Sequence, residues 1–367
     1  MPDEFPSVIA HVGSADPAFS QLWRLGQDES AGALRPLAPA EALPCASWLL
    51  ADAPRGLLYA AHELREGMVA VYRPGRAGSP CLQRQGSGAG GAVHLARATG
   101  TGAEALLIAH YEAAALTMQA LDAQGLLTGE GTHWPSDPAG RWRPGPPQAQ
   151  NAPPGSRARS GHEAAHLHMV CPSPDGRHVL ATDLGLDRIQ VWRRTGPLQL
   201  QAREGLALTP GAGPRHFLFS PRRADRVHVL CEESSTLATL AFDAEEGRLR
   251  LLDEISVLPP GFAGTSYASD LLVAPDGRHL YALNRLFDAV SLLALDDDGL
   301  PRLQDHFWTR GSYPRSAALD PAGRFLYVCN ERSDHLAVLR VEPGMGLAAT
   351  GLHVAVPRPV CVHLGRW

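Results

Sequence analysis

Lysine is absent from this chain, and all 33 of its basic residues are arginine. A Schiff-base lysine and a phosphate-binding lysine are therefore excluded. Positive charge is not in excess either, because 38 acidic residues leave a formal net charge of −5. This balance argues against a nucleic-acid partner. No run of 18 or more apolar residues occurs, so we expect no membrane-spanning segment.

Paired cysteines are also missing. The six cysteines stand alone in the sequence, which argues against structural zinc or a redox pair and predicts reduced thiols. His162, His166 and His168 lie close together, but no cysteine or cluster of carboxylates accompanies them, so we predict neither a metal nor an organic cofactor. The nucleophile-elbow, P-loop and zincin motifs do not occur. The opening residues MPDEFPSVIAHVG lack the features of a secretory signal, which predicts a cytoplasmic protein.

Aromatic residues are scarce at 6%, whereas 37 glycines and 31 prolines favour short elements joined by many turns. Six segments repeat one pattern, in which an apolar strand, a short polar turn and a second apolar strand follow one another. Their β-branched residues and partial alternation favour strands over helices. The first turn positions of the six copies are His62, His110, Asp183, Cys231, Asn284 and Asn330, spaced by 48, 73, 48, 53 and 46 residues.

Each repeat has the content of a propeller blade. Four copies follow a tight turn of the SPDGR type and a further short apolar run, which gives about four strands per unit. We therefore predict an all-β fold, a single seven-bladed β-propeller domain over residues 1–367 with four-stranded antiparallel blades. The seventh blade is expected from pairing of SVIAHVG with the C-terminal stretch 352–364, which closes the ring. A six-bladed ring with an N-terminal extension is the alternative, and a Pro- and Gly-rich insertion over about 129–163 explains the one long spacing.

Topology brings the polar residues of these repeats to one face. The start of the first strand and the end of the second lie on the same side of each blade, and the inner strands surround the ring axis. Strand starts carry His94, His168, Arg215–His216, Asp270 and Arg315; strand ends carry His62–Glu63, His110–Tyr111, Asp183, Glu232–Glu233, Asn284–Arg285 and Asn330–Glu331. Imidazoles and carboxylates transfer protons near neutral pH, and guanidinium groups bind carboxylate or phosphate. This face therefore suits a small anionic, oxygen-rich substrate, although Asp183, Asn284 and Asn330 also fit structural turns.

Longer stretches around these residues carry a family resemblance. They are AHLHMVCPSPDGRHVLATDLGLDRIQVW, GAGPRHFLFSP, ASDLLVAPDGRHLYALNR, YPRSAALDPAGRFLYVCNERSDHLAV and PRPVCVHL, all within 164–364. In them the chain resembles the lactonase family of seven-bladed propellers, which includes propeller-type 6-phosphogluconolactonases and a fungal carboxymuconate-cyclising enzyme. The combination of DLGLDR, GPRH and PVCV is far more specific than the SPDGR turn. Residues 1–128 resemble the family less, since a GPCH-like motif reads GAVH at 91–94 and an NYGGG-like turn reads HYEAA at 110–114.

The resemblance implies a catalytic set. The family positions correspond to His168, Arg215, Glu232 and Arg285, with Cys231 standing where the family has asparagine. Glu63, His94, Asp270 and Arg315 are predicted to bind substrate, the last two because they also match polar family positions and the first two from their place on the rim.

The implied activity is hydrolysis of a sugar lactone, most closely 6-phosphogluconolactone. His168 or Glu232 would act as general base, and the arginines would stabilise the oxyanion or hold the anionic group of the substrate. A cycloisomerase acting on a muconate-type dicarboxylate and a non-enzymatic binding propeller are the alternatives. We expect a monomer or a weak homodimer.

Overall fold

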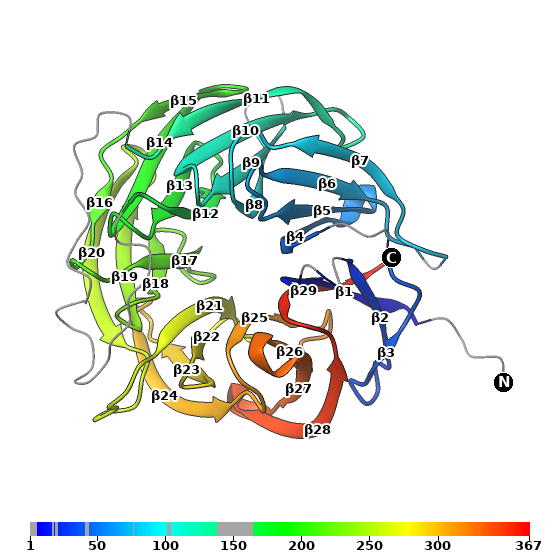
Figure 1. Ribbon diagram of the computed structural model, residues 1–367. Coiled ribbons are helices and arrows are strands. Elements are labelled where there is room, and N and C mark those ends of the chain that lie inside the picture. The colour runs from blue at the N-terminus through cyan, green and yellow to red at the C-terminus, as the bar shows by residue number, and fades with distance from the viewer. Residues whose placement is uncertain are drawn as a thin grey trace.

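Seven antiparallel sheets are arranged as a ring (Figure 1). The computed structural model describes residues 6–16, 18, 21–40, 44–75, 77–100, 104–137 and 164–367. Each sheet is a four-stranded blade, and the outermost strand of one blade is split in two. The predicted seven-bladed propeller is thereby confirmed, and the six-bladed alternative is wrong.

The strands of each blade follow one another from the ring axis outward. The innermost strands, which contact one another around the axis, are β4 (Ala46–Asp52), β8 (Ala92–Ala98), β12 (Leu167–Pro172), β17 (Pro214–Phe219), β21 (Tyr267–Val273), β25 (Pro314–Leu319) and β29 (Pro359–Arg366). The second strands are β5 (Leu57–His62), β9 (Ala105–His110), β13 (His178–Asp183), β18 (Arg226–Cys231), β22 (His279–Arg285), β26 (Phe325–Asn330) and β1 (Val8–Ser14).

The outer half of each blade is made of two further strands. The third strands are β6 (Met68–Tyr72), β10 (Ala115–Leu121), β14 (Arg188–Gly196), β19 (Thr236–Asp243), β23 (Ala289–Leu295), β27 (His335–Val341) and β2 (Trp23–Gln27). The outer strands are β7 (Cys81–Gly86), β11 (Leu127–Pro135), β15 (Gln199–Ala202) with β16 (Leu206–Ala207), β20 (Arg248–Ser256), β24 (Pro301–Trp308), β28 (Leu347–Ala355) and β3 (Leu34–Pro36). Three 3₁₀ turns complete the description: η2 (Ala53–Arg55), η3 (Glu331–Ser333) and η4 (Pro343–Met345).

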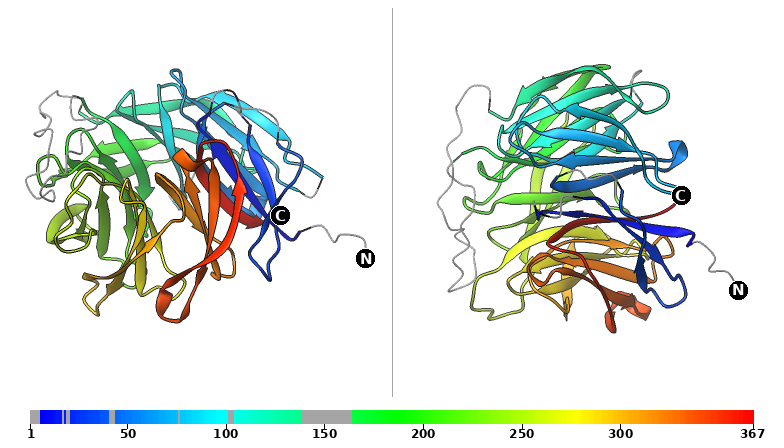
Figure 2. Two further views of the ribbon diagram at one scale, coloured as in Figure 1. Left: turned by 60° about the horizontal axis from the view of Figure 1, so that its bottom comes forward. Right: turned by 45° about the vertical axis from the view of Figure 1, so that its right-hand side comes forward.

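We number the blades in chain order. Blade 1 holds β4–β7, blade 2 β8–β11, blade 3 β12–β16, blade 4 β17–β20, blade 5 β21–β24 and blade 6 β25–β28. The closure blade combines β29 with β1, β2 and β3. Strand β1 pairs with β29 in antiparallel register, with His11 opposite His363, so the predicted closure is confirmed. Both strands lie side by side in every view (Figure 2).

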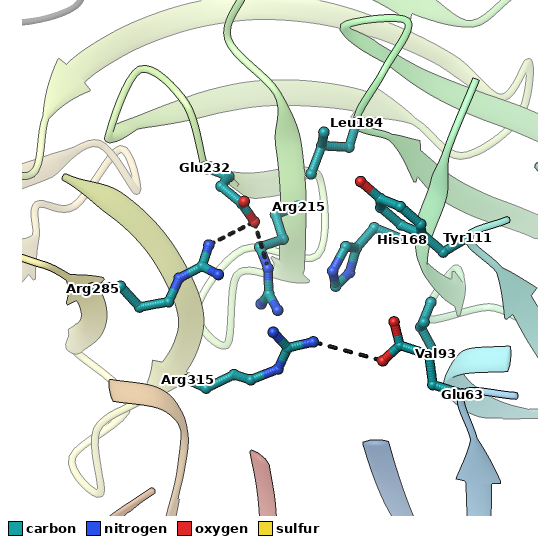
Figure 3. A pocket seen from close by; sticks show the side chains of 9 residues that line it. All are labelled: Glu63, Val93, Tyr111, His168, Leu184, Arg215, Glu232, Arg285 and Arg315. Atoms are coloured by element: carbon teal, nitrogen blue, oxygen red, sulfur yellow. Dashed lines mark ion pairs between the residues drawn. The ribbon is translucent and has the colours of Figure 1, made fainter. Parts of the chain in front are cut away.

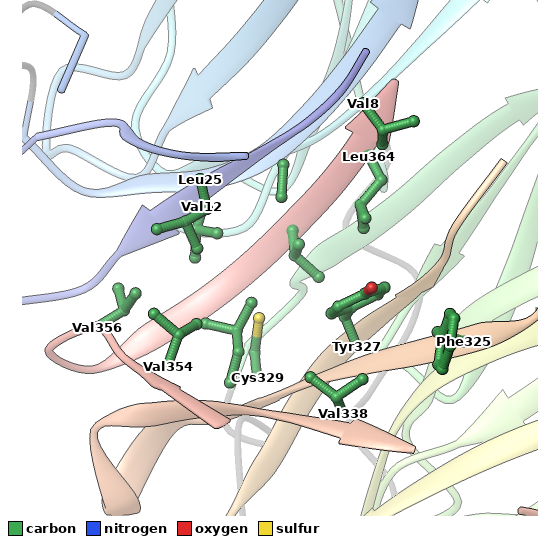
Figure 4. Packing of buried hydrophobic residues seen from close by; sticks show 13 residues of the cluster. Val8, Val12, Leu25, Phe325, Tyr327, Cys329, Val338, Val354, Val356 and Leu364 are labelled. Carbon is green, nitrogen blue, oxygen red and sulfur yellow. The ribbon is translucent and has the colours of Figure 1, made fainter. Parts of the chain in front are cut away.

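Apolar residues of the middle strands form the core between neighbouring blades. All six residues of β5 are buried, whereas outer strand β7 alternates between half-buried and exposed positions. This gradient explains why the second and third strands were the clearest repeats in the sequence. Figure 4 shows one such layer, where Val8 and Leu364 of the closure blade pack with Tyr327 and Val338 of blade 6. These contacts join the two ends of the ring.

The predicted insertion begins later than its composition indicates. Outer strand β11 continues to Pro135 and pairs with β10, so residues 129–135 belong to blade 2. Residues 138–163, which include His162, lie outside the described residues. Among the residues that are described, no helix is long and apolar enough to cross a membrane.

Candidate active site

A β-bulge at the start of the inner strands positions the site. In blade 3, Leu167 pairs with Asp183 and Met169 pairs with Thr182, which leaves His168 as the extra residue. The corresponding residues are Ser47, Val93, Arg215, Arg315 and Val360, while Ser269 and Asp270 together oppose a single residue in blade 5. A bulge breaks the alternation of a strand and redirects a side chain. His168, Arg215 and Arg315 therefore lie in the bulges, each at the second residue of its inner strand.

Turns between second and third strands hold these bulges in place. Asp187 follows β13, and its carboxylate accepts hydrogen bonds from Gly211 N (2.6 Å) and Gly213 N (2.8 Å), just before the Arg215 bulge. Gly213 has a φ of 65°, and a Cβ there would lie 2.7 Å from Glu233 Cγ. The two most specific motifs, DLGLDR and GAGPRH, are thus in contact with each other. Asp288 likewise accepts Tyr313 N (2.7 Å), ahead of the Arg315 bulge.

A cavity of about 210 Å³ opens among these bulges (Figure 3). Its lining consists of Glu63, Val93, Tyr111, His168, Leu184, Arg215, Glu232, Arg285 and Arg315. Six of the eight predicted site residues therefore meet in one place, including the whole predicted catalytic set. We call this space the main cavity.

Glu232 is shared by two arginines. Its Oε2 lies 2.8 Å from Arg215 Nε and 2.7 Å from Arg285 Nη2, and all three side chains are nearly buried. Burial raises the pKa of Glu232, but the charges of Arg285 and Arg215 outweigh it and hold the pKa below its usual 4.5. Burial lowers the pKa of Arg215 to about 10, which still leaves it cationic at neutral pH. The cluster is a fixed, ionised group with one more positive than negative charge.

The three arginines differ in the donors they leave available. Arg285 uses Nε and Nη2 on the carbonyls of Tyr267 and Ala268 and on Glu232, and its Nη1 makes a 3.5 Å contact with the Tyr313 hydroxyl. Arg215 donates through Nη1 to Ser269 O, and its Nη2 makes no hydrogen bond within the described residues.

Arg315 makes only long ion pairs, 3.7 Å to Glu63 and 3.8 Å to Glu331. Burial opposes its charge, but Glu63 and Glu331 outweigh that effect and raise its pKa. Arg315 and Arg215 Nη2 are therefore the donors best placed to bind an anionic group.

His168 is a buried, neutral imidazole at the wall of the main cavity. Burial lowers its pKa well below the usual 6.5, and Arg215 lowers it further. The Tyr111 ring packs edge-on against the imidazole of His168, with 5.8 Å between the ring centroids, and it also stacks on His166. Figure 3 shows the imidazole directed toward the arginines across the cavity. A neutral imidazole at neutral pH can accept a proton from water.

His94 and Asp270, predicted to bind substrate, do not line the main cavity. His94 and His216 each follow the bulge residue of their strand, Asp270 is the second bulge residue of blade 5, and the three side chains lie close together. His216 Nδ1 lies 2.9 Å from Asp270 Oδ1, and burial and Arg215 lower the His216 pKa. The neutral ring therefore donates to Asp270 and accepts from Arg215 Nη1 at 3.2 Å through Nε2. Asp270 thus positions Arg215 through His216.

Three lining residues were missed as site candidates. Tyr111 was placed on the correct rim, and its position after β9 is the signal that could have identified it. Val93 and Leu184 are apolar, so no sequence signal separates them from core residues.

Comparison with known proteins assigns the fold to a family. The family model described as "Lactonase, 7-bladed beta-propeller" matches residues 9–364. The chain belongs to this lactonase family. A 6-phosphogluconolactonase of Bacillus subtilis (strain 168) is 30% identical over 59% of this chain and 62% of its own length. One of Sodalis glossinidius is 32% identical over 49% of this chain and 55% of its own length. The chain therefore matches little more than half the length of these curated relatives.

Solved structures extend the likeness over the whole lactonase ring. The periplasmic gluconolactonase of Pseudomonas aeruginosa has a TM-score of 0.83 and 25% identity, covering 97% of this chain and 98% of its own. A Lactobacillus plantarum protein reaches a TM-score of 0.84 at 22% identity, covering 98% and 99%, which shows the fold alone. One relative is periplasmic, so the cytoplasmic location stays a prediction.

Proposed function

We propose that the chain hydrolyses a sugar lactone in the main cavity and that its substrate is 6-phosphogluconolactone. The observation that carries the proposal is the convergence of a neutral buried imidazole, His168, with three guanidinium groups on one cavity. An ester carbonyl needs a base for water and donors for the oxyanion, and the phosphate needs a cation. Relatives named 6-phosphogluconolactonase agree with this substrate.

The reaction follows from the available atoms. Water adds to the lactone carbonyl while His168 takes its proton, and Arg215 Nη2 donates to the developing oxyanion. The bond between the carbonyl carbon and the ring oxygen then breaks, and the protonated His168 returns the proton to that oxygen. The product is the open-chain hydroxy acid. Arg315, whose N–H groups make no hydrogen bond within the described chain, holds the phosphate.

Glu232 has a supporting role in this scheme. Its Oε2 is engaged by two guanidinium groups at 2.8 and 2.7 Å, so it is a poorer proton acceptor than His168. It orients Arg215 and Arg285 and keeps two like charges together in a buried place. Of the two bases that the sequence leaves open, we therefore favour His168.

The test is hydrolysis of freshly generated 6-phosphogluconolactone by the wild type and by His168→Asn. We expect kcat to fall about 100-fold, or about 2.7 kcal/mol of barrier, with little change in KM. In the wild type, kcat/KM should stay level from about pH 8 to pH 6, because the His168 pKa lies well below 6.5. The exposed His353 offers a matched control as His353→Asn.

Each outcome is decisive. Wild-type turnover equal to the spontaneous rate would refute the substrate, and loss of a muconate-type dicarboxylate's ultraviolet absorbance would then favour the cycloisomerase. Equal activity of His168→Asn and wild type would refute the assigned base.

A further inference from the structure

A second cavity adjoins the main one at the same face. It measures about 270 Å³ and shares two lining residues, Glu63 and Arg315, with the main cavity. Its other lining side chains include Ser47, Glu112, Glu331 and Arg358. Figure 3 shows the ion pair between Arg315 and Glu63, the two residues that line both cavities. Arg315 Nη2 and Glu63 Oε2 lie 3.7 Å apart, which is too long for a hydrogen bond. The N–H groups of Arg315 and the carboxylate of Glu63 can therefore bind a ligand in either cavity.

The lining side chains give the two cavities net charges of opposite sign, positive in the main cavity and negative in the second. In the main cavity three arginines face two carboxylates, Glu232 and Glu63. In the second cavity three carboxylates, Glu63, Glu112 and Glu331, face two arginines. An anionic group is therefore attracted to the main cavity and disfavoured in the second. A neutral group rich in hydroxyls suits the second cavity, because a hydroxyl donates to a carboxylate and accepts from a guanidinium.

Glu331 gives independent evidence of a ligand, because one of its carboxylate oxygens has no hydrogen-bond donor among the described residues. Its side chain is about nine-tenths buried in the turn after β26, and its Oε1 accepts from Arg358 Nη2 at 2.9 Å. Its Oε2 is buried and makes no hydrogen bond within the described residues, and Arg315 Nη1 lies 3.8 Å away. A buried carboxylate oxygen without a donor is unfavourable unless a ligand supplies one.

We propose that the second cavity binds the C2–C4 hydroxyl edge of the sugar lactone, with Glu331 as its main acceptor. This inference rests on the lactone hydrolysis proposed above. In 6-phosphogluconolactone the carbonyl, ring oxygen and phosphate lie along one edge of the ring, and the C2, C3 and C4 hydroxyls lie along the other. The first edge matches the arginine-rich main cavity and the second matches the carboxylate-rich cavity. Arg315 then contacts the substrate between the two edges.

The proposal predicts specificity for hydroxylated rings. The experiment compares kcat/KM for glucono-δ-lactone and δ-valerolactone, which share the six-membered ring but differ in hydroxyls, after subtraction of the spontaneous rates. In the wild type the hydroxylated lactone should be favoured at least about tenfold. In Glu331→Gln that ratio should fall about tenfold, because a charged acceptor is replaced by a neutral amide. The δ-valerolactone rate itself should change less than about twofold.

Two further variants keep the result interpretable. Glu112→Gln changes an exposed residue of the same cavity and should lower the ratio by a smaller factor without endangering the fold. Glu342→Gln, on the outer side of blade 6, should leave the ratio unchanged. An equal loss with both lactones, or an unchanged ratio in Glu331→Gln, would overturn the proposed hydroxyl site while leaving lactone hydrolysis intact. Failure of the wild type on both lactones and on 6-phosphogluconolactone would refute the proposed function, and the inference with it.

Discussion

Blades 1 and 2 share their backbone with blades 3–6 but not their chemistry. In blades 1, 2, 3, 4 and 6 a bulge at the start of the inner strand adds one extra residue near the mouth of the ring, and in blade 5 the bulge holds Ser269 and Asp270. The extra residue is Ser47 or Val93 in blades 1 and 2, and His168, Arg215 or Arg315 in blades 3, 4 and 6. The bulge therefore belongs to the scaffold, and the residue at the bulge decides what the inner strand of a blade contributes to the site.

The turns between second and third strands show the same division. Residues with positive φ there include Asp187, Ser235, Asp288 and Asp334 after β13, β18, β22 and β26, and Gly67 and Ala114 after β5 and β9. In blades 3–6 the side-chain oxygen bonds to the segment that leads to the next inner strand. Glycine and alanine have no such oxygen. In blades 3–6 these hydrogen bonds therefore fix the segment that carries the next inner strand and its bulge residue.

Acid should separate blades 1 and 2 from blades 5 and 6 most strongly. His62 and His110 end the second strands of blades 1 and 2, where blades 5 and 6 carry Asn284 and Asn330. Burial lowers the pKa of both histidines from 6.5 to about 4. The unfolded chain binds these protons below about pH 6.5 and the folded chain only below about pH 4. Stability is therefore complete above pH 6.5 and falls by about 3 kcal/mol per histidine as the pH drops to 4.

Hydrogen exchange at pH 7 and pH 5 measures this difference locally. We expect blades 1 and 2 to lose protection before blades 5 and 6. The double variant His62→Asn with His110→Asn should unfold in urea with less dependence on pH than the wild type. First loss of protection in blades 5 and 6 would show that other groups control acid unfolding.

Substitution at equivalent bulge positions should divide activity in the same way. Arg215→Ala removes the donor proposed for the oxyanion and one of the two guanidinium groups that contact Glu232, so we expect kcat/KM to fall about 100-fold, or about 2.7 kcal/mol. Val93→Ala, at the same position of blade 2, should lower kcat/KM less than about threefold. Both are measured on 6-phosphogluconolactone. Similar losses of kcat/KM in the two variants would mean that activity depends on the shape of the cavity rather than on the charge of Arg215.

The loss of a turn aspartate should have a smaller effect. Asp187→Ala removes the acceptor for two backbone N–H groups ahead of Arg215, and we expect about 2 kcal/mol less stability in urea unfolding. Activity should fall about tenfold because Arg215 is held less firmly. Asp187→Asn retains one acceptor oxygen and should recover part of both losses. If Asp187→Ala lost stability but kept full kcat/KM, the aspartate would support the fold without positioning the site.

The sequence predicts the propeller fold and the face that carries the site, but not which side chains line the cavity and which lie behind the lining. Turn chemistry and repeat spacing are local, so the second and third strands and the polar rim could be predicted. Outer strand β11, with the sequence LTGEGTHWP, is largely exposed and has no apolar pattern, so its composition places part of it in the predicted insertion. His94 and His168 both start inner strands, yet only His168 is a bulge residue. That difference depends on strand register, which a single sequence does not show.

The smallest expected effect concerns Ala114, the only non-glycine residue of blades 1 and 2 in the described chain that has positive φ within its turn after the second strand. Its φ is 47°, a conformation that strains an alanine by about 1–2 kcal/mol. Ala114→Gly removes the strain but adds about 0.5–1 kcal/mol of unfolded-state entropy, so we expect a net gain of about 0.5 kcal/mol.

The matched substitution in blade 5 should act in the opposite direction. Asp288→Gly removes the same kind of strain but also the bond to Tyr313 N, so the unfolding free energy should fall. Thermal unfolding and urea unfolding give Tm and the free energy of unfolding for both variants. For Ala114→Gly we expect Tm to shift by less than about 2 °C. Stabilisation by both substitutions would show that backbone strain dominates these turns and that the aspartate bonds add little. Destabilisation by both would show that the Ala114 methyl group contributes to packing more than its strained backbone costs.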